Sequence, residues 1–182
     1  ATVHAGRMGR AARVDDAAGR YIEFCKGTMP FGVLFSGMPI ALDCAHGATY
    51  KVAPAVLREL GAKVNVIGNR PDGMNINDRC GSTQPAAMQR HVVETGADVG
   101  VALDGDGDRV VLADSDGNLV DGDEMLYIIA SARKAEGRFN GGVVGTVMTN
   151  FGLELALSGM DIPFIRTDVG DRHIHRALIS NG

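Results

Sequence analysis

Three aspartates at every second position are the residues of this chain best suited to chemistry. They lie between Asp104 and Arg109, with a glycine after each of the first two and the arginine directly after the last. Carboxylates packed this closely repel one another unless a positive charge neutralises them, and hard divalent cations prefer oxygen ligands. The glycines remove side-chain bulk and widen the choice of backbone angles. The stretch therefore predicts a cation site with Asp104, Asp106 and Asp108 as its ligands.

Three interpretations of this acidic stretch compete. An EF-hand calcium loop needs glycine at position 6 and glutamate at position 12, where this chain has Arg109 and Ser115; a looser calcium loop in a binding module stays open. The second interpretation is a solvated acidic turn without a ligand. Against it, one or two polar residues would be enough to form a turn between two apolar strands. The third is Mg²⁺ in a phosphoryl-transfer site, where Arg109 offers a planar guanidinium to the same phosphate. We favour the third because a cation beside a guanidinium suits a dianionic phosphate.

Hydrophobic periodicity predicts the elements that position the acidic stretch. Strands are predicted at residues 39–44, 63–67, 98–103, 110–113 and 119–120. Helices are predicted at residues 15–26, 52–60, 84–95 and 125–134. Asp15 or Asp16 is placed to cap the first helix, and Asp121 with Glu124 resembles a capping box at the start of the last. The strand–helix–strand order of residues 39–67 implies parallel strands joined by a right-handed crossover.

The pattern restarts after residue 142. Strands are predicted at 143–148 and 163–167, and helices at 151–157 and 169–179. This is the same strand–cap–helix–glycine–strand order that residues 39–67 show, about 100 residues later, and it predicts a repeated α/β module. The second copy reaches the last residue before its sheet is complete, and the chain starts without methionine. We therefore expect a piece of a longer protein.

Composition narrows the class of protein. The formal net charge is −4, with no cluster of lysine and arginine, which argues against a nucleic-acid partner. No apolar run approaches the roughly 18 residues that cross a bilayer, so we expect no membrane partner. Three widely spaced cysteines, Cys25, Cys44 and Cys80, indicate reduced thiols rather than a disulfide or zinc site, and a cytoplasmic location.

The acidic stretch and its neighbouring motifs resemble the α-D-phosphohexomutases, the family of phosphoglucomutase and phosphomannomutase. The acidic stretch is similar to the metal-binding loop of that family. Further similar motifs lie at residues 19–26, 41–50, 75–77, 80–82, 122–127, 143–146 with Asn150, and 169–172. Because these motifs follow in order from about Ala12 onward, the resemblance covers nearly the whole chain.

The resemblance implies a fold of four α/β domains around a central cleft, with the first three built alike. Residues 1–36 would be the tail of domain 1 and a linker. Residues 37–139 would be the metal-binding domain 2, and residues 140–182 the N-terminal part of domain 3. The expected fold class is α/β, with repeated three-layer mixed α/β domains, one complete and one truncated.

The resemblance also implies a chemistry. Asp104, Asp106 and Asp108 would hold one Mg²⁺, which a phosphoserine of domain 1 would also ligate. Arg109 would steady the transferring phosphoryl group, and Arg172 would contact the phosphosugar. The motifs are most similar to family members that interconvert glucosamine 6-phosphate and glucosamine 1-phosphate through a bisphosphorylated intermediate, on the route to UDP-N-acetylglucosamine and the bacterial cell wall. The alternative is a similarity to members that act on mannose or glucose phosphates. The resemblance also allows a homodimer of the full-length enzyme.

Three parts of the family pattern are absent from this sequence. They are the Ser-x-Asn-Pro motif that carries the phosphoserine, the Gly-Glu-x-Ser-Gly-His sugar loop and the C-terminal phosphate-binding segment. A chain without these groups cannot place a substrate against its nucleophile. We therefore expect the 182-residue chain to bind Mg²⁺ weakly and, by itself, to turn over no substrate.

Overall fold

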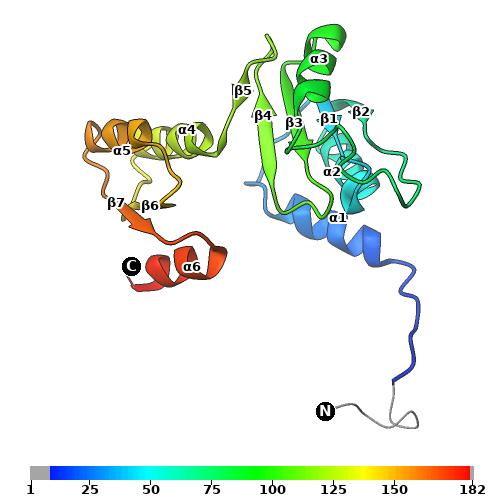
Figure 1. Cartoon of the computed structure of the whole chain (residues 1–182), viewed down its shortest axis with the longest axis horizontal. Helices are drawn as coiled ribbons and strands as arrows, with labels where there is room; N and C mark the ends of the chain where they lie inside the picture. Colours follow the sequence, from blue (N-terminus) through cyan, green and yellow to red (C-terminus); the bar gives the residue numbers. More distant parts are fainter. Residues whose placement is uncertain (1–8, 181–182) are drawn as a thin grey trace.

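Helices and strands occur together along residues 9–180, the part of the chain that the computed structural model describes (Figure 1). The first part contains α1 (Ala17–Gly27), β1 (Pro39–Asp43), the 3-10 turn η2 (Ala48–Tyr50), α2 (Val52–Glu59), β2 (Lys63–Ile67), α3 (Ala86–Thr95), β3 (Val99–Leu103), β4 (Val110–Ala113) and β5 (Leu119–Val120). The second part contains α4 (Gly122–Ala135), β6 (Val143–Thr146), α5 (Phe151–Ser158), β7 (Phe164–Thr167) and α6 (Asp171–Ser180). The predicted mixed α/β class is confirmed.

A five-stranded mixed sheet forms the first part, in the order β2-β1-β3-β4-β5. β1 is parallel to both β2 and β3, and Asp43 at its end pairs in register with Ala102 of β3. β4 and β5 then continue the sheet in antiparallel pairings. Because the crossovers from β1 to β2 and from β2 to β3 run in opposite directions across the sheet, right-handed connections place α2 and α3 on opposite faces.

Small residues of the sheet allow α3 to pack closely on one face. Met88 and Val92 of α3 are fully buried in one cluster with alanines of the neighbouring strands; those alanines are Ala41, Ala102 and Ala113. A Cβ atom on Gly100 of β3 would lie 2.2 Å from Sδ of Met88. A larger residue at position 100 would push α3 away from β3. The packing of α3 on β3 therefore fixes the strand that leads directly into the acidic stretch.

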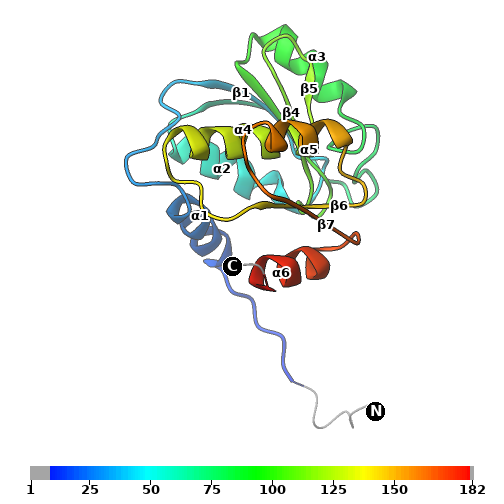
Figure 2. The same ribbon diagram turned by 90° about the vertical axis from the view of Figure 1, so that its left-hand side faces the viewer.

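The second part is built on a parallel pair of strands, β6 and β7, connected through α5. In Figure 2, α4 and α5 lie on one side of this pair and α6 lies on the other. The core is a separate apolar cluster that includes Leu153 and Leu157 of α5 and Val143 of β6. The strand–helix–strand repeat predicted for residues 143–167 is thus present, with β1-α2-β2 as its first copy.

Helix α4 packs with the second cluster. Its Ala130 is buried there, and Leu126 packs against the same residues. The predicted capping box at its start is confirmed: Asp121 accepts from the backbone of Glu124 at 2.9 Å, and the Glu124 side chain accepts from the backbone of Asp121. The division between residues 139 and 140 stays a prediction, but this packing favours a boundary near residue 121.

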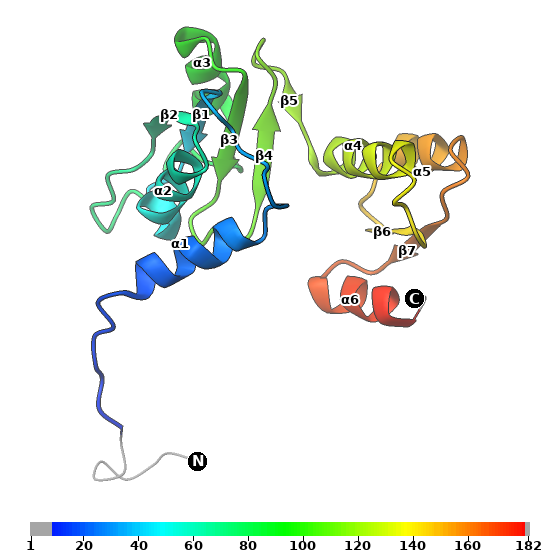
Figure 3. The same cartoon turned by 180° about the vertical axis from the view of Figure 1, so that it is seen from behind.

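Helix α1 differs in two ways from the sequence prediction. Asp16 occupies the N-cap but makes no side-chain capping bond, because its carboxylate instead pairs with Arg20 at 2.7 Å. The apolar stripe lies at the surface, with Tyr21 56% and Phe24 68% exposed. The helix rests against α2, where Lys26 pairs with Glu59 at 2.7 Å (Figure 3). No helix of residues 9–180 is both long and apolar enough to cross a membrane.

Candidate metal centre

The acidic stretch forms the connection between β3 and β4, and we call residues 104–109 the metal loop. The two strands are antiparallel, and Leu103 and Val110 face each other as the last paired residues before the loop. Within the loop, the backbone N–H of Gly107 donates to the carbonyl of Asp104 at 3.1 Å. Gly107 has a φ of 77°, a left-handed conformation that costs a glycine little. The loop thereby turns its alternate side chains toward one side.

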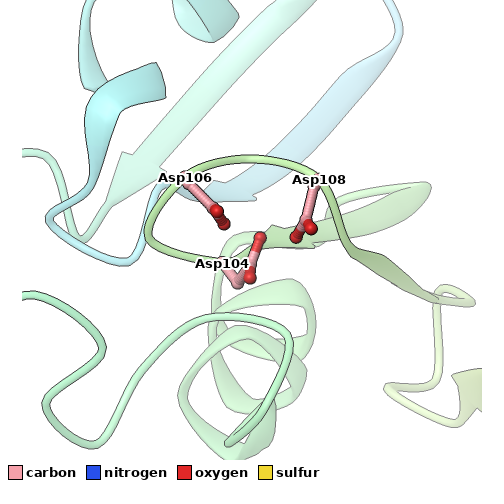
Figure 4. Close-up of side chains that lie close together, drawn as sticks. All are labelled: Asp104, Asp106 and Asp108. Carbon is pink, nitrogen blue, oxygen red and sulfur yellow. The ribbon is translucent and has the colours of Figure 1, made fainter. Parts of the chain in front are cut away.

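The three aspartates converge at this loop. Each offers one carboxylate oxygen, and these oxygens lie within 4.8 Å of one another (Figure 4). Asp104 is 1% exposed, whereas Asp106 and Asp108 are exposed to solvent. An all-carboxylate donor set fits Mg²⁺, a hard cation that takes oxygen ligands and keeps further positions for water or phosphate oxygens. The geometry therefore suits a cation held by the buried carboxylate and approached from solvent.

Arg109 lies against the innermost carboxylate. Its Nε donates to Oδ2 of Asp104 at 2.8 Å, its Nη2 lies 2.7 Å from the same oxygen, and its backbone N–H donates to Oδ1 at 3.1 Å. Nε also lies 3.5 Å from Oδ1 of Asp108. The Arg109 side chain is nevertheless 62% exposed, so the predicted phosphate-facing arginine is anchored to Asp104 and still accessible from solvent.

The pKa values of Asp104 and Asp108 are shifted in opposite directions. Burial by itself would raise the pKa of Asp104, but the hydrogen bonds and positive charge of Arg109 outweigh it, and the pKa lies below its ordinary value. The pKa of Asp108 is raised, first by partial desolvation and then by the negative charges of Asp106 and Asp104. The pKa of Arg109 is raised by its bonds to Asp104. Asp106 and Asp108 therefore repel each other on the outer side of the loop, although Nε of Arg109 lies 3.5 Å from Oδ1 of Asp108.

Neighbouring loops explain why Gly105 and Gly107 are glycines. A Cβ atom on Gly105 would lie 2.7 Å from the Ile76 side chain and 2.8 Å from Nδ2 of Asn77. A Cβ atom on Gly107 would lie 2.5 Å from Cγ2 of Thr49. The sequence suggested glycine for convergence of the aspartates, and the structure adds close packing against two other loops as a second reason.

The structure does not bring Arg172 into the carboxylate cluster. Arg172 is an exposed residue in the first turn of α6, which packs on β6 and β7 of the second part. Asp43, which sequence reasoning missed, is fully buried at the end of β1, next to β3. The sequence contains a signal for Asp43, because an acidic residue at the carboxyl end of a buried parallel strand lies where ligands of α/β proteins bind.

Comparison with known proteins agrees with this architecture. The profile of phosphoglucomutase/phosphomannomutase alpha/beta/alpha domain II matches residues 20–117, and the domain III profile matches residues 121–182. The first match covers more than half of the chain. The chain belongs to the phosphoglucomutase/phosphomannomutase family. The resemblance noted from the sequence motifs is thereby confirmed, and both matches describe three-layer domains.

Relatives within the phosphoglucomutase/phosphomannomutase family are similar over the whole chain. The phosphoglucosamine mutase of Chromohalobacter salexigens is 59% identical over 181 residues, 100% of this chain and 40% of its own length. That of Marinobacter nauticus is 60% identical over 174 residues, 96% of this chain and 39% of its own length. A crystal structure of a family protein from Burkholderia thailandensis superposes with a TM-score of 0.76 at 21% identity, covering 91% of this chain and 36% of that one. The chain thus spans about 40% of the curated relatives' length.

Metal affinity in this family member is expected to depend on pH. Bound metal needs deprotonated carboxylates, and the raised pKa of Asp108 lets protons compete at a higher pH than at an ordinary aspartate. As pH falls through that pKa, we expect the Kd for Mn²⁺ to rise by up to about tenfold per pH unit. Electron paramagnetic resonance titrations of free Mn²⁺ from pH 7.5 down to the ordinary aspartate pKa of 3.8 measure this. Asp108→Asn should bind Mn²⁺ more weakly at pH 7, and its Kd should depend less steeply on pH. An equally steep dependence would contradict the assignment of the pH effect to Asp108.

Proposed function

We propose that this chain supplies the metal centre of a phosphoglucosamine mutase, which interconverts glucosamine 6-phosphate and glucosamine 1-phosphate. The observation that carries the proposal is the convergence of Asp104, Asp106 and Asp108 beside Arg109. The support for the substrate is the 59–60% identity to proteins of that name. We assign Mg²⁺ as the cofactor, because a hard cation with open coordination positions suits three carboxylates and a phosphate.

Each residue of the loop has a distinct task in this proposal. Bound Mg²⁺ would supply Lewis-acid polarisation of a phosphoryl oxygen. Asp104, buried and held by Arg109, keeps its carboxylate in one orientation, and the exposed Asp106 and Asp108 face the side from which a phosphoryl group arrives. The exposed Arg109 guanidinium would donate to the oxygens of that group, which would stabilise charge as it transfers.

Arg172 and the cellular location complete the proposal. Arg172 would contact a phosphate of the sugar substrate from the first turn of α6, where the positive end of the helix dipole favours an anion. All three cysteines are free thiols, and Cys44 and Cys80 are buried. Free thiols accord with a reducing compartment, so we place the reaction in the cytoplasm. A homodimer of the complete enzyme stays a prediction.

Metal titration tests the metal centre directly. For the 182-residue chain we expect Kd values on the order of 1 mM for both Mg²⁺ and Ca²⁺, since a three-carboxylate site keeps much of the ion's hydration. A hexose phosphate ester should tighten Mg²⁺ binding several-fold, because phosphate adds a ligand and meets Arg109. Calorimetric titration with and without the ester separates the hypotheses. Tight Ca²⁺ binding that ignores the ester would instead support a calcium-binding module.

Substrate choice is tested in the complete enzyme. We expect kcat/KM for glucosamine 6-phosphate to exceed that for mannose 6-phosphate and glucose 6-phosphate by at least about tenfold. Protein groups placed to accept hydrogen bonds from the amino group of the sugar would lose some of these bonds when a hydroxyl takes its place. A coupled assay of 1-phosphate formation measures the three rates. A preference for mannose or glucose phosphate would reject the glucosamine assignment and leave the metal centre intact.

A further inference from the structure

Asp43 is a buried carboxylate that the proposed chemistry does not use. Of the charged residues that the structure describes, only Asp43 and Asp104 are buried, at 0% and 1% exposure. Asp43 ends β1, and Asp104 follows the last residue of the neighbouring strand β3. Burying a carboxylate is costly unless hydrogen bonds compensate it. The partners of Asp43 therefore indicate what the buried charge stabilises.

Both oxygens of Asp43 accept hydrogen bonds from backbone N–H groups of different loops. Oδ1 accepts from Ala45 at 2.9 Å, in the turn that follows β1 (residues 44–49, the β1 turn). Oδ2 accepts from Gly81 at 2.7 Å, in the segment that follows β2 (residues 68–82, the β2 loop). The two loops also bond directly, since the N–H of Asn77 donates to the carbonyl of Ala45 at 2.9 Å. Asp43 thus joins two segments that are distant in sequence.

The same two loops hold the backbone on either side of Asp104. From the β1 turn, the N–H of Ala48 donates to the carbonyl of Gly105 at 2.8 Å. From the β2 loop, the N–H of Ser82 donates to the carbonyl of Leu103 at 2.9 Å. The residues before and after the buried metal ligand are therefore each fixed by a loop that Asp43 fixes.

Close packing leaves these loops little freedom to shift independently. A Cβ atom on Gly47 would lie 2.2 Å from the carbonyl oxygen of Gly105, and one on Gly81 would lie 2.5 Å from that of Leu103. Gly68 at the start of the β2 loop passes as closely to Asp43, since its Cβ would lie 2.3 Å from Oδ1. Because backbone meets backbone where Gly47 and Gly81 approach the metal loop, a displacement of either loop is transmitted to it.

We propose that Asp43 is a positioning residue for the metal loop, which it holds in its metal-binding geometry by joining the β1 turn to the β2 loop. Asp43 acts through Ala48 and Ser82 and does not itself ligate the ion. The part that concerns metal affinity rests on the proposed metal centre, whereas the positioning of the loop can be measured without metal.

Asp43→Asn tests the inference in the 182-residue chain. Asparagine keeps the shape but turns one acceptor into an NH₂ donor, which would face a backbone N–H. Groups that orient metal ligands typically change metal affinity 10–100-fold, so we expect the Kd for Mn²⁺ to rise about 10-fold or more. Asp114→Asn is the matched control, because Asp114 accepts from the N–H groups of Asp116 and Asn118 in the turn beyond the far end of β4. Its Kd should stay within about twofold.

Hydrogen exchange supplies the readout that does not need metal. In Asp43→Asn the amides of Ala48 and Ser82 should exchange at least about tenfold faster, while amides of α3, in the same part of the chain, keep their rates. In the unsubstituted chain, Mg²⁺ should reciprocally slow exchange of Ala45 and Gly81, because coupling between two sites is mutual. This second measurement decides the matter if Asp43→Asn does not fold.

The outcomes separate the two proposals. An unsubstituted chain that binds no Mn²⁺ rejects the metal centre, and the exchange rates of Ala48 and Ser82 in Asp43→Asn still decide the positioning role. A folded Asp43→Asn variant with unchanged Mn²⁺ affinity and unchanged exchange at those amides overturns the positioning role alone. Faster exchange throughout the first part, α3 included, would also overturn it, because it would show a general loss of stability there.

Discussion

Replacement of Asp104 by asparagine is expected to abolish measurable Mg²⁺ binding and to lower mutase activity of the complete enzyme by about 10³-fold. Asp104 is the one proposed ligand that is both buried and anchored, by Arg109 at 2.7 Å. Lewis-acid polarisation by a metal contributes several kcal/mol to catalysis, and each 1.36 kcal/mol is tenfold in rate. Asparagine retains an oxygen that can accept from the Arg109 backbone, so the fold should survive the change.

Thermal and chemical unfolding supply a second measure of the Asp104 effect. A ligand at ten times its Kd stabilises the folded state by about 1.4 kcal/mol, since only the folded chain binds it. The unsubstituted chain should show this gain in Mg²⁺, and Asp104→Asn should show none. Asp106→Asn is the control, because its exposed carboxylate is less constrained and should weaken binding less than Asp104→Asn does. Full Mg²⁺ stabilisation of Asp104→Asn would reject Asp104 as a ligand.

Replacement of Leu157 by alanine is expected to cost about 2–5 kcal/mol of stability in the second part of the chain while metal affinity is unchanged. Leu157 is fully buried in the cluster with Val143 and Leu153. The cluster beneath α3, which supports the metal loop, contains none of these residues. Loss of packing in one cluster should therefore not reach the other.

Leu155→Ala is the matched control for Leu157→Ala. It removes the same atoms from the same helix, but Leu155 is 57% exposed, so the cost should stay below about 1 kcal/mol. Hydrogen exchange resolved by residue measures stability in each part, and Mn²⁺ titration measures the metal loop. If Leu157→Ala weakened Mn²⁺ binding as strongly as it destabilised α5, the two parts would be one cooperative unit, and the predicted division of the chain would be wrong.

Local signals in the sequence predicted most of the elements because their information lies within a few residues. The capping box of Asp121 and Glu124 is a four-residue pattern, and Asn150 likewise caps α5 by accepting from Leu153 at 2.8 Å. The alternating aspartates and glycines marked the metal loop in the same way. Asp16 did not cap α1, because a nearby arginine at position 20 competed successfully for its carboxylate.

Features that depend on contacts between distant segments were not predictable in the same way. Hydrophobic periodicity identified the helix that begins after Asp121 but not which cluster it would join, and its Ala130 packs with Leu153 of α5. Asp43 lies within the predicted strand 39–44, where its position at a strand end could be noted but its partner could not, because its hydrogen bond to Gly81 spans 38 residues. Such pairings become visible only when the strands are placed side by side.

The connection between β3 and β4 also limits how the chain can change in length. Leu103 and Val110 are paired across the sheet, and the six residues between them are the whole metal loop. A single inserted or deleted residue that the loop absorbed would break the alternate spacing of the aspartates, and one that it did not absorb would shift the register of β4 by one, so that each side chain of that strand would change faces. Ala113 would leave its buried position beneath α3, and the exposed Val110 would turn inward. Insertions tolerated in ordinary surface turns should therefore be excluded here, and length variation should fall in the β2 loop around the exposed Gly73 and Met74.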